Sequence, residues 1–366
     1  CWVCLGARAD RVSALNFLMT ANAGIVVVAV AGLRKYLPTK ETWQNAQLHW
    51  EIGTEVEPEI LAQRLVLMGY ERQSMVGKPG EFSIRGSIID VYPLNAEYPV
   101  RVELFDVEID SIRYFEADTQ RSLENLEEVT ISPMTDLVFS KADMNHGMMR
   151  LQDALEKRLA TAKDQTETDF LEEYFGQLLS SWEQGIPTEN AHYYTDFLYQ
   201  QKTTLLDYLP ENSLLFVDDY SRMMETEREI AREEAEWQTL KIEEMRVFSE
   251  QTFGVDFHDQ LRKTARNTTF FSLFQKGMGN LRFQEVHNFQ YRSMQQFFGQ
   301  MPLLKAEVDR WQKQNQTVVV FVPTKERIQK VEELFQDFDI PSVVSNWDQL
   351  LDGHVQIVQG LSLIHI

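Results

Sequence analysis

The chain has 366 residues, 43% of them apolar and 25% charged, enough to bury the cores of two or three globular domains. Its formal net charge of −21 excludes a general DNA-coating protein, because binding to phosphates needs a surface of lysine and arginine. There is no uncharged apolar run of about 18 residues and no signal-peptide pattern. Only Cys1 and Cys4 are cysteines, which favours a reducing cytoplasm over a disulfide framework or a zinc site.

The first predicted elements are a helix over residues 9–19 and a strand over residues 24–30. The strand, GIVVVAV, is a continuous β-branched run, typical of a parallel strand covered on both faces. The character changes from residue 48 to about residue 133. An amphipathic helix over residues 57–70, with acidic residues in its first turn, is followed by short alternating strands separated by turn signals. This stretch indicates a compact α+β module.

The rest of the chain predicts helices and parallel strands. A charged helical region at 141–184 precedes a looser aromatic loop at 186–201, a buried strand at 213–217 (SLLFV) and an acidic helix at 221–247. A small α/β domain follows. Its predicted elements are a helix at 293–314, a strand at 316–324, a helix at 325–338 and strands at 341–345 and 354–360.

The most enzyme-like feature is the apolar strand that ends in Asp218 and Asp219. Nucleoside triphosphatases present a Mg²⁺-binding carboxylate and a water-positioning carboxylate in this way, at the carboxyl end of a strand. The partner motif, G-x-x-x-x-G-K-[ST], is absent from the chain. We therefore expect no ATP hydrolysis by this segment, no other catalytic residues and no metal site.

Strand alternation separates the residues of FSIRGSIID, residues 82–90. Phe82, Ile84 and Ile88 are predicted to pack inward, and Arg85 to point to the other side. Gly86 is predicted to keep the backbone beside the arginine uncluttered.

Alternation in PVRVELFDVEI, residues 99–109, places Arg101 and Phe105 together on one side of the next strand. One face of the module is therefore predicted to carry Arg85, Arg101 and Phe105. Arginine beside an exposed aromatic side chain is typical of an interface hot spot. The alternative is an ordinary polar outer face with Arg101 paired to a nearby glutamate.

The stretch GEFSIRGSIIDVYPLNAEYPVRVELFDVEIDSIRYFEADTQRSL, residues 80–123, resembles the signature region of the bacterial transcription-repair coupling factors, in the module that they share with the excision-repair protein UvrB. Its continuation, ENLEEVTISP, favours the coupling factors over UvrB. The resemblance extends to residues 8–18, 24–38, 203–219, 318–335 and 354–360.

The resemblance implies a fold class of α/β type. A degenerate P-loop-NTPase-like parallel-sheet domain would hold an inserted α+β module like domain 2 of UvrB, and a small α/β domain would follow. The implied boundaries are 1–46 for the end of the first UvrB-like subdomain, 47–133 for the α+β UvrA-interaction module, 134–285 for the second part of the degenerate ATPase domain, and 286–366 for a truncated α/β domain.

The resemblance also implies a function. The family recruits UvrA to lesions where RNA polymerase has stalled, in transcription-coupled nucleotide excision repair, and its UvrA-contacting positions fall on Arg85, Arg101 and Phe105. The full-length family is an ATP-dependent, helicase-like translocase on double-stranded DNA. Its polymerase-binding and motor domains, with their ATP and Mg²⁺, would lie after Ile366. The chain is therefore expected to be a cytoplasmic fragment that is not an enzyme and needs no cofactor.

Two alternatives remain. A UvrB-like ATPase that verifies DNA damage would need a phosphate loop before Cys1, and its strand would end in a D-E-x-H motif, whereas residues 218–222 are DDYSR, without histidine. A structural module that only restrains the motor domains would not bind UvrA. Both ends of the chain are predicted to be cut, and residues 361–366 are predicted not to be native sequence.

Overall fold

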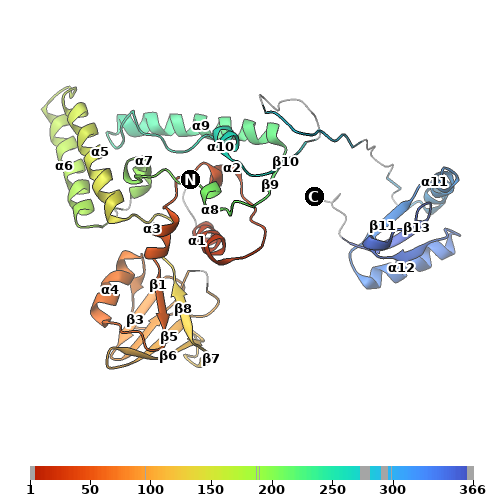
Figure 1. Ribbon diagram of the computed structural model, residues 1–366, viewed down its shortest axis with the longest axis horizontal. Coiled ribbons are helices and arrows are strands. Elements are labelled where there is room, and N and C mark those ends of the chain that lie inside the picture. The colour runs from red at the N-terminus through yellow and green to blue at the C-terminus, as the bar shows by residue number, and fades with distance from the viewer. Residues whose placement is uncertain are drawn as a thin grey trace. The chain divides into compact units, whose positions relative to one another are not determined.

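The computed structural model describes residues 5–94, 96–186, 188, 190–272, 281–289, 296–297 and 299–360, with side chains from residue 8 onward. The predictions for Cys1, Cys4 and residues 361–366 lie outside these residues. The chain divides into two compact units, residues 1–282 and 283–366, and each is described by itself (Figure 1). Among the described helices, none has the length and apolarity needed to cross a bilayer.

A six-stranded sheet dominates the first part of unit 1 and confirms the predicted α+β character of this stretch. The strand order is β2-β3-β4-β5-β6-β7, antiparallel except for the parallel pair β2–β3. The strands are β2 (Glu71–Arg72), β3 (Glu81–Arg85), β4 (Ile88–Val91), β5 (Val100–Phe105), β6 (Glu108–Phe115) and β7 (Ser122–Leu126). Strands β1 (Leu48–Glu51) and β8 (Glu128–Ile131) form a separate antiparallel pair.

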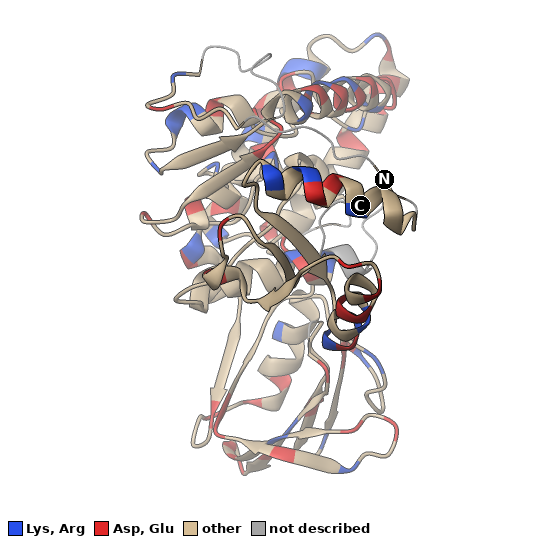
Figure 2. Ribbon diagram, turned by 90° about the vertical axis from the view of Figure 1, so that its right-hand side faces the viewer, with Lys and Arg blue, Asp and Glu red and all other residues tan. Residues whose placement is uncertain are grey.

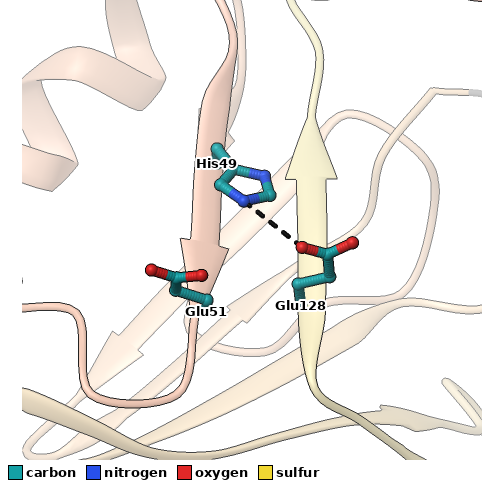
Figure 3. Close-up of side chains that lie close together, drawn as sticks. All are labelled: His49, Glu51 and Glu128. Atoms are coloured by element: carbon teal, nitrogen blue, oxygen red, sulfur yellow. Dashed lines mark ion pairs between the residues drawn. The ribbon is translucent and has the colours of Figure 1, made fainter. Parts of the chain in front are cut away.

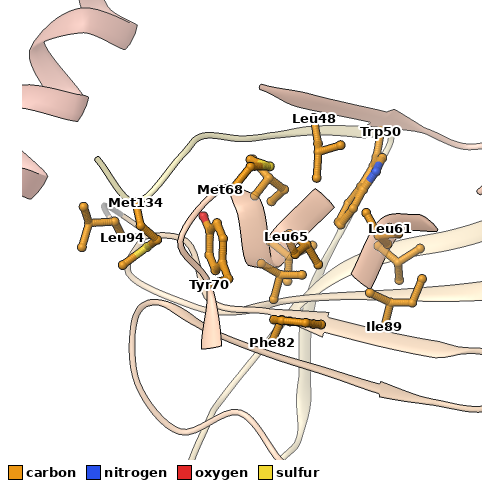
Figure 4. Packing of buried hydrophobic residues seen from close by; sticks show 14 of the residues in the cluster. Leu48, Trp50, Leu61, Leu65, Met68, Tyr70, Phe82, Ile89, Leu94 and Met134 are labelled. Atoms are coloured by element: carbon orange, nitrogen blue, oxygen red, sulfur yellow. The ribbon is translucent and has the colours of Figure 1, made fainter. Parts of the chain in front are cut away.

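One helix, α4 (Pro58–Leu67), supplies part of the core of this module. It lies within the helix predicted over residues 57–70, and the proline in its first turn suits the fixed backbone angle of a helix start. Leu61 and Leu65 of α4 belong to the same buried cluster as Phe82 and Ile89 of the sheet (Figure 4). The face of the sheet that carries Phe82 and Ile89 therefore packs against α4 as the core face, and the opposite face is not part of this core.

The turn between β3 and β4 differs from the prediction for Ile88. Arg85 pairs with Ile88 across a two-residue turn, so Ile88 lies on the arginine side and Ile89 takes the core side. The prediction counted the alternation of faces straight through the turn and so assigned Ile88 to the wrong face. In a hairpin with a two-residue turn, the residues on either side of the turn are cross-strand partners and their side chains lie on the same face. Gly86 has a φ of 62°, and the space around an added Cβ would be open. Glycine is therefore explained by the backbone angle and not by crowding.

The amino-terminal segment confirms one prediction and contradicts another. Helix α1 (Leu5–Thr20) covers the predicted helix, but residues 24–30 form no strand, and Ile25 and Val27 are almost fully exposed. Within the described part of the chain no strand pairs with this run. A β-branched run becomes a strand only when a neighbouring strand satisfies its backbone hydrogen-bonding groups. The high β propensity of residues 24–30 was therefore not sufficient to form a strand. Two short helices follow, α2 (Val30–Leu33) and α3 (Lys40–Asn45), the latter capped by Thr39.

A helical hairpin confirms the predicted helical region at 141–184. It consists of α5 (Lys141–Leu159) and α6 (Gln165–Glu183), with a capping box of Ser140 and Asp143 at the start of α5. The predicted loose aromatic loop is instead part of the core. It contains η1 (Ala191–Tyr193) and α7 (Thr195–Leu198), and Tyr194 and Phe197 are buried beside α6. Consecutive aromatics in a turn-rich stretch were therefore a signal of packing.

The remainder of unit 1 contains a parallel strand pair. Strand β9 (Leu215–Asp218) pairs in parallel with β10 (Thr268–Phe271), and the predicted acidic helix is α9 (Tyr220–Glu243). Helices α8 (Leu205–Tyr208) and α10 (Phe257–Lys263) complete this part. The prediction that the strand is buried is wrong for Leu214 and Phe216, which are exposed. The described residues place only these two strands in this sheet, so the P-loop-like arrangement stays a prediction.

Unit 2 is a small α/β domain, as predicted. Its parallel sheet has the order β11-β13-β12, with β11 (Val318–Val322), β12 (Val343–Ser345) and β13 (Val355–Gln359). Helices α11 (Met301–Lys313) and α12 (Lys325–Asp337) and the turn η2 (Trp347–Gln349) complete it. The predicted helix at 293–314 starts at Met301 in the structure, and residues 293–295 and 298 lie outside the described part.

Four buried tyrosines are expected to make the folded state unstable at high pH. Burial raises the pKa of Tyr70, Tyr194, Tyr199 and Tyr208 above the ordinary value of 10.0. A pKa raised in the folded state stabilises the fold below the unfolded value, and this stability is lost as pH rises above about 10.

We expect these four phenols to ionise only when the chain unfolds. The measurement is an alkaline titration that follows phenolate absorbance and far-ultraviolet circular dichroism together. If all 12 tyrosines titrated in one step with the circular dichroism unchanged, the proposed coupling between these phenols and the fold would be contradicted.

Candidate interaction site

The face of the sheet opposite to the core carries the residues predicted for the interface. The strand register places Ser83, Asp90, Arg101 and Arg113 in one cross-strand row. The next row, toward the Gly86 turn, contains Arg85, Ile88, Glu103 and Ser111. Because β3 and β5 run in the same direction, Arg85 and Phe105 both lie at the ends of their strands, at the same end of the sheet.

Asp90 is the centre of this face, and its side chain is fully buried. Its Oδ2 accepts a hydrogen bond from Nη2 of Arg85 at 2.6 Å. Arg101 donates from Nε to Oδ1 at 2.7 Å and from Nη2 to Oδ2 at 2.9 Å. A buried carboxylate is stable only when it is paired and hydrogen-bonded, so the two arginines are what allow Asp90 to lie in this strand.

Arg101 has further contacts besides those with Asp90. Its Nη2 also donates to Oε1 of Gln120 at 2.7 Å, and its guanidinium lies 4.2 Å from the centre of the buried Phe115 ring. The hydrogen bonds to Asp90 raise the pKa of Arg101 above its ordinary value, against the opposing effect of burial. Only 11% of the side chain is exposed. The alternative of a glutamate partner for Arg101 is wrong in this detail, because the carboxylate is that of Asp90.

Arg85 is more open, with 39% of its side chain exposed. Its Nη1 donates to the backbone oxygen of Ser74 at 3.3 Å, and the hydroxyl of Ser83 donates to the same oxygen at 3.0 Å. The segment after β2 therefore lies over one edge of the face, with Val76 buried in it. The face is partly covered from within the chain, and the guanidinium of Arg85 lies at the border of the covered part.

Phe105 is exposed over 78% of its surface, at the end of β5. The hairpin that holds it is tight, since Asp106 has a φ of 60° and the amide of Val56 donates to the backbone oxygen of Val107 at 2.6 Å. The β5–β6 register shifts between Glu103 and Leu104, a bulge beside the ring. The backbone below Phe105 is thus fixed, and its ring is presented to solvent.

A second ion pair lies in the same rows. Glu103 accepts a hydrogen bond from Arg113, and this bond lowers the pKa of Glu103 below its ordinary value. The pair is neutral, so it adds no charge to the Arg85–Asp90–Arg101 cluster, whose net charge is +1.

Sequence reasoning missed Asp90 and Gln120 as parts of this site. A signal for Asp90 existed, because it is a single acid inside the apolar run IIDVYP, opposite positions that carry arginine. Gln120 has a φ of 59° in the turn between β6 and β7, and nothing in its sequence context indicated that it reaches Arg101.

Asp218 and Asp219 lie where the sequence placed them, at the carboxyl end of β9. Asp219 has a left-handed backbone, with φ 48°, and its side chain caps α9 by accepting a hydrogen bond from the amide of Arg222 at 3.3 Å. Asp218 is exposed. One of the two carboxylates therefore has a structural role in starting a helix.

A group of metal-ligating side chains lies on the β1–β8 pair (Figure 3). His49, Glu51 and Glu128 have ligand atoms within 4.8 Å of one another, and Nε2 of His49 is 3.5 Å from Oε2 of Glu128. Glu51 and Glu128 are direct cross-strand partners, an unfavourable like-charge pair that the imidazole lies beside. All three side chains are exposed, and nothing buried constrains them toward an ion.

Comparison with known proteins supports the module assignment. Residues 48–137 match the family model described as the UvrB interaction domain. The chain is 37% identical over 354 residues to the transcription-repair-coupling factor of Bacillus subtilis (strain 168), and 31% identical over 359 residues to that of Staphylococcus aureus (strain MRSA252).

Each alignment covers 96% of this chain and 30% of the relative. The chain thus spans about 30% of the length of these curated relatives, in their amino-terminal part. The chain therefore belongs with the amino-terminal region of the transcription-repair-coupling factors, and its residues 48–137 are a UvrB interaction domain.

Proposed function

We propose that this chain is a recruitment module that binds UvrA through the outward face of its six-stranded sheet, in transcription-coupled nucleotide excision repair where RNA polymerase has stalled. The observation that carries the proposal is the position of Arg85 and Phe105 at one end of this face, inside the segment that matches the UvrB interaction domain. A protruding aromatic ring at the same end of the sheet as an anchored arginine has the composition of an interface hot spot.

The chemistry of the face indicates what UvrA would supply. The Arg85–Asp90–Arg101 cluster has one positive charge in excess, in a chain of net charge −21. Basic and acidic residues are interspersed along the ribbon (Figure 2). A partner carboxylate would balance the cluster, and an apolar pocket would bury the ring of Phe105. Such complementarity sets specificity and the association rate more than the raw affinity.

We assign the other activities expected of the full-length family to other parts of such a protein. These are binding of RNA polymerase and ATP- and Mg²⁺-dependent movement on double-stranded DNA. Two observations support a binding role for this segment over ATP hydrolysis. Asp219 is engaged in capping α9, and residues 218–222 are DDYSR, without the histidine of a D-E-x-H motif. A UvrB-like ATPase would be expected to carry that histidine here and a phosphate loop before Cys1.

We expect Phe105→Ala to weaken UvrA binding about 30-fold, equivalent to about 2 kcal/mol, because a hot-spot aromatic loses its buried contact area. The whole 366-residue chain is titrated against purified Bacillus subtilis UvrA by biolayer interferometry. Ile60→Ala is the matched control, since Ile60 is an exposed apolar residue on α4 of the same module.

Unchanged affinity of the Phe105→Ala protein, with the parent chain binding, would place the interface elsewhere. Absence of UvrA binding by the parent chain would contradict the recruitment function itself and favour a purely structural module.

A further inference from the structure

We infer that Asp90 is the positioning residue of this interface and that Arg101 acts on the partner only through Asp90 and Arg85. The inference rests on the proposed function and deepens it, because it divides the predicted residues into two classes. Arg85 and Phe105 contact the partner. Arg101 and Asp90 hold Arg85 in place and contact nothing outside the chain.

The first argument is that Arg101 has little left to offer a partner. Two of its three nitrogens are donors to Asp90, one of them also to Gln120, and one face of its guanidinium lies on Phe115. With 11% of its side chain exposed, it would have to leave a buried carboxylate to reach an external group. Removing one partner of a buried pair is strongly unfavourable, so such a movement on binding is not expected.

The second argument is that Arg85 is both anchored and open. Nη2 is fixed on Asp90 and Nη1 on the backbone oxygen of Ser74, while 39% of the side chain remains exposed. A long flexible side chain that is already ordered loses less conformational entropy on binding, and this preorganisation increases affinity. Asp90 supplies the stronger of the two anchors, since its bond to Arg85 is charge-assisted and 2.6 Å long.

A substitution of Asp90 separates positioning from charge, because the two hypotheses predict opposite signs. Asp90→Asn keeps the volume of the side chain and raises the net charge of the cluster from +1 to +2. If only positive charge attracts UvrA, binding becomes tighter. If Asp90 positions Arg85, binding becomes weaker despite the added charge, and we expect a loss of about 10-fold, in the range of a lost charge-assisted hydrogen bond.

The role of Arg101 is tested by a double-mutant cycle. Arg101→Lys keeps the charge but loses the planar fork that pairs with Asp90. We expect it to weaken UvrA binding about 5-fold in the parent chain and less than about 2-fold in the Arg85→Ala background, because residues that act through a shared partner are not additive. Arg72→Ala, a change at an exposed arginine of β2, is the matched control.

Affinities are measured with purified UvrA and the whole chain, and hydrogen exchange of the β3–β5 amides verifies that each variant is folded. Tighter binding by Asp90→Asn, or an equal loss from Arg101→Lys in both backgrounds, overturns the inference. If the Asp90→Asn protein does not fold, the Arg101→Lys double-mutant cycle still tests whether Arg101 acts through Arg85. These outcomes differ from failure of the proposed function, in which the parent chain itself does not bind UvrA.

Discussion

Replacing Asp90 with alanine is expected to lower the free energy of unfolding of the six-stranded sheet by about 3–5 kcal/mol, the usual cost of breaking a buried ion pair. The carboxylate is fully buried and accepts three hydrogen bonds from two guanidinium groups. Without it, Arg101 keeps its positive charge in a mostly buried position, with Gln120 and the ring of Phe115 as its remaining contacts. Loss of the carboxylate therefore leaves one uncompensated charge and a cavity.

The measurement is hydrogen exchange of the β3–β5 amides as a function of urea, which separates this sheet from the rest of the chain. Asp110→Ala is the matched control, because Asp110 is an exposed acid on β6 of the same sheet, and we expect a change within about 0.5 kcal/mol. Equal exchange for the Asp90→Ala and Asp110→Ala proteins would show that Asp90 does not stabilise the sheet.

Replacing Phe175 with alanine is expected to destabilise the α5–α6 hairpin by about 3–5 kcal/mol, the usual effect of removing a large aromatic side chain from a packed core. Phe175 is fully buried in α6. Its ring centre lies 4.8 Å from that of Phe248 and 6.4 Å from that of Tyr194, which come from segments distant in the sequence. The substitution therefore removes aromatic contacts that help to join the hairpin to the rest of unit 1.

The effect is read from hydrogen exchange of the α5 and α6 amides in urea. Phe216→Ala is the control, a phenylalanine whose ring is mostly exposed on β9 and stacks on Phe271. We expect it to cost less than about 1 kcal/mol, within the range of an aromatic pair. Comparable losses from the two substitutions would mean that the cluster around Phe175 contributes no more than a surface contact.

Periodicity in the sequence was sufficient to predict five of the longer helices. The amphipathic pattern predicted α4, α5, α6, α9 and α12, because a helix buries one face and exposes the other whatever it packs against. It failed at residues 24–30, where β-branched residues form no strand, and at residues 186–201, where aromatic residues predicted as a loop are buried around Tyr194. In both stretches the outcome depends on neighbours that are distant in sequence, which no local pattern contains.

By itself the sequence determined the family resemblance and the side of the sheet on which Arg85, Arg101 and Phe105 lie, since alternation within one strand is a local property. Only the tertiary structure decided how these three residues differ. The register of β3, β4 and β5 brings the single acid Asp90 between two arginines. Gln120 accepts a hydrogen bond from the mostly buried Arg101, whereas Arg85 is bonded at one side to the backbone of Ser74 and stays partly exposed. Burial and pairing follow from contacts between strands, and those contacts made Arg101 an internal support and left Arg85 and Phe105 at the surface.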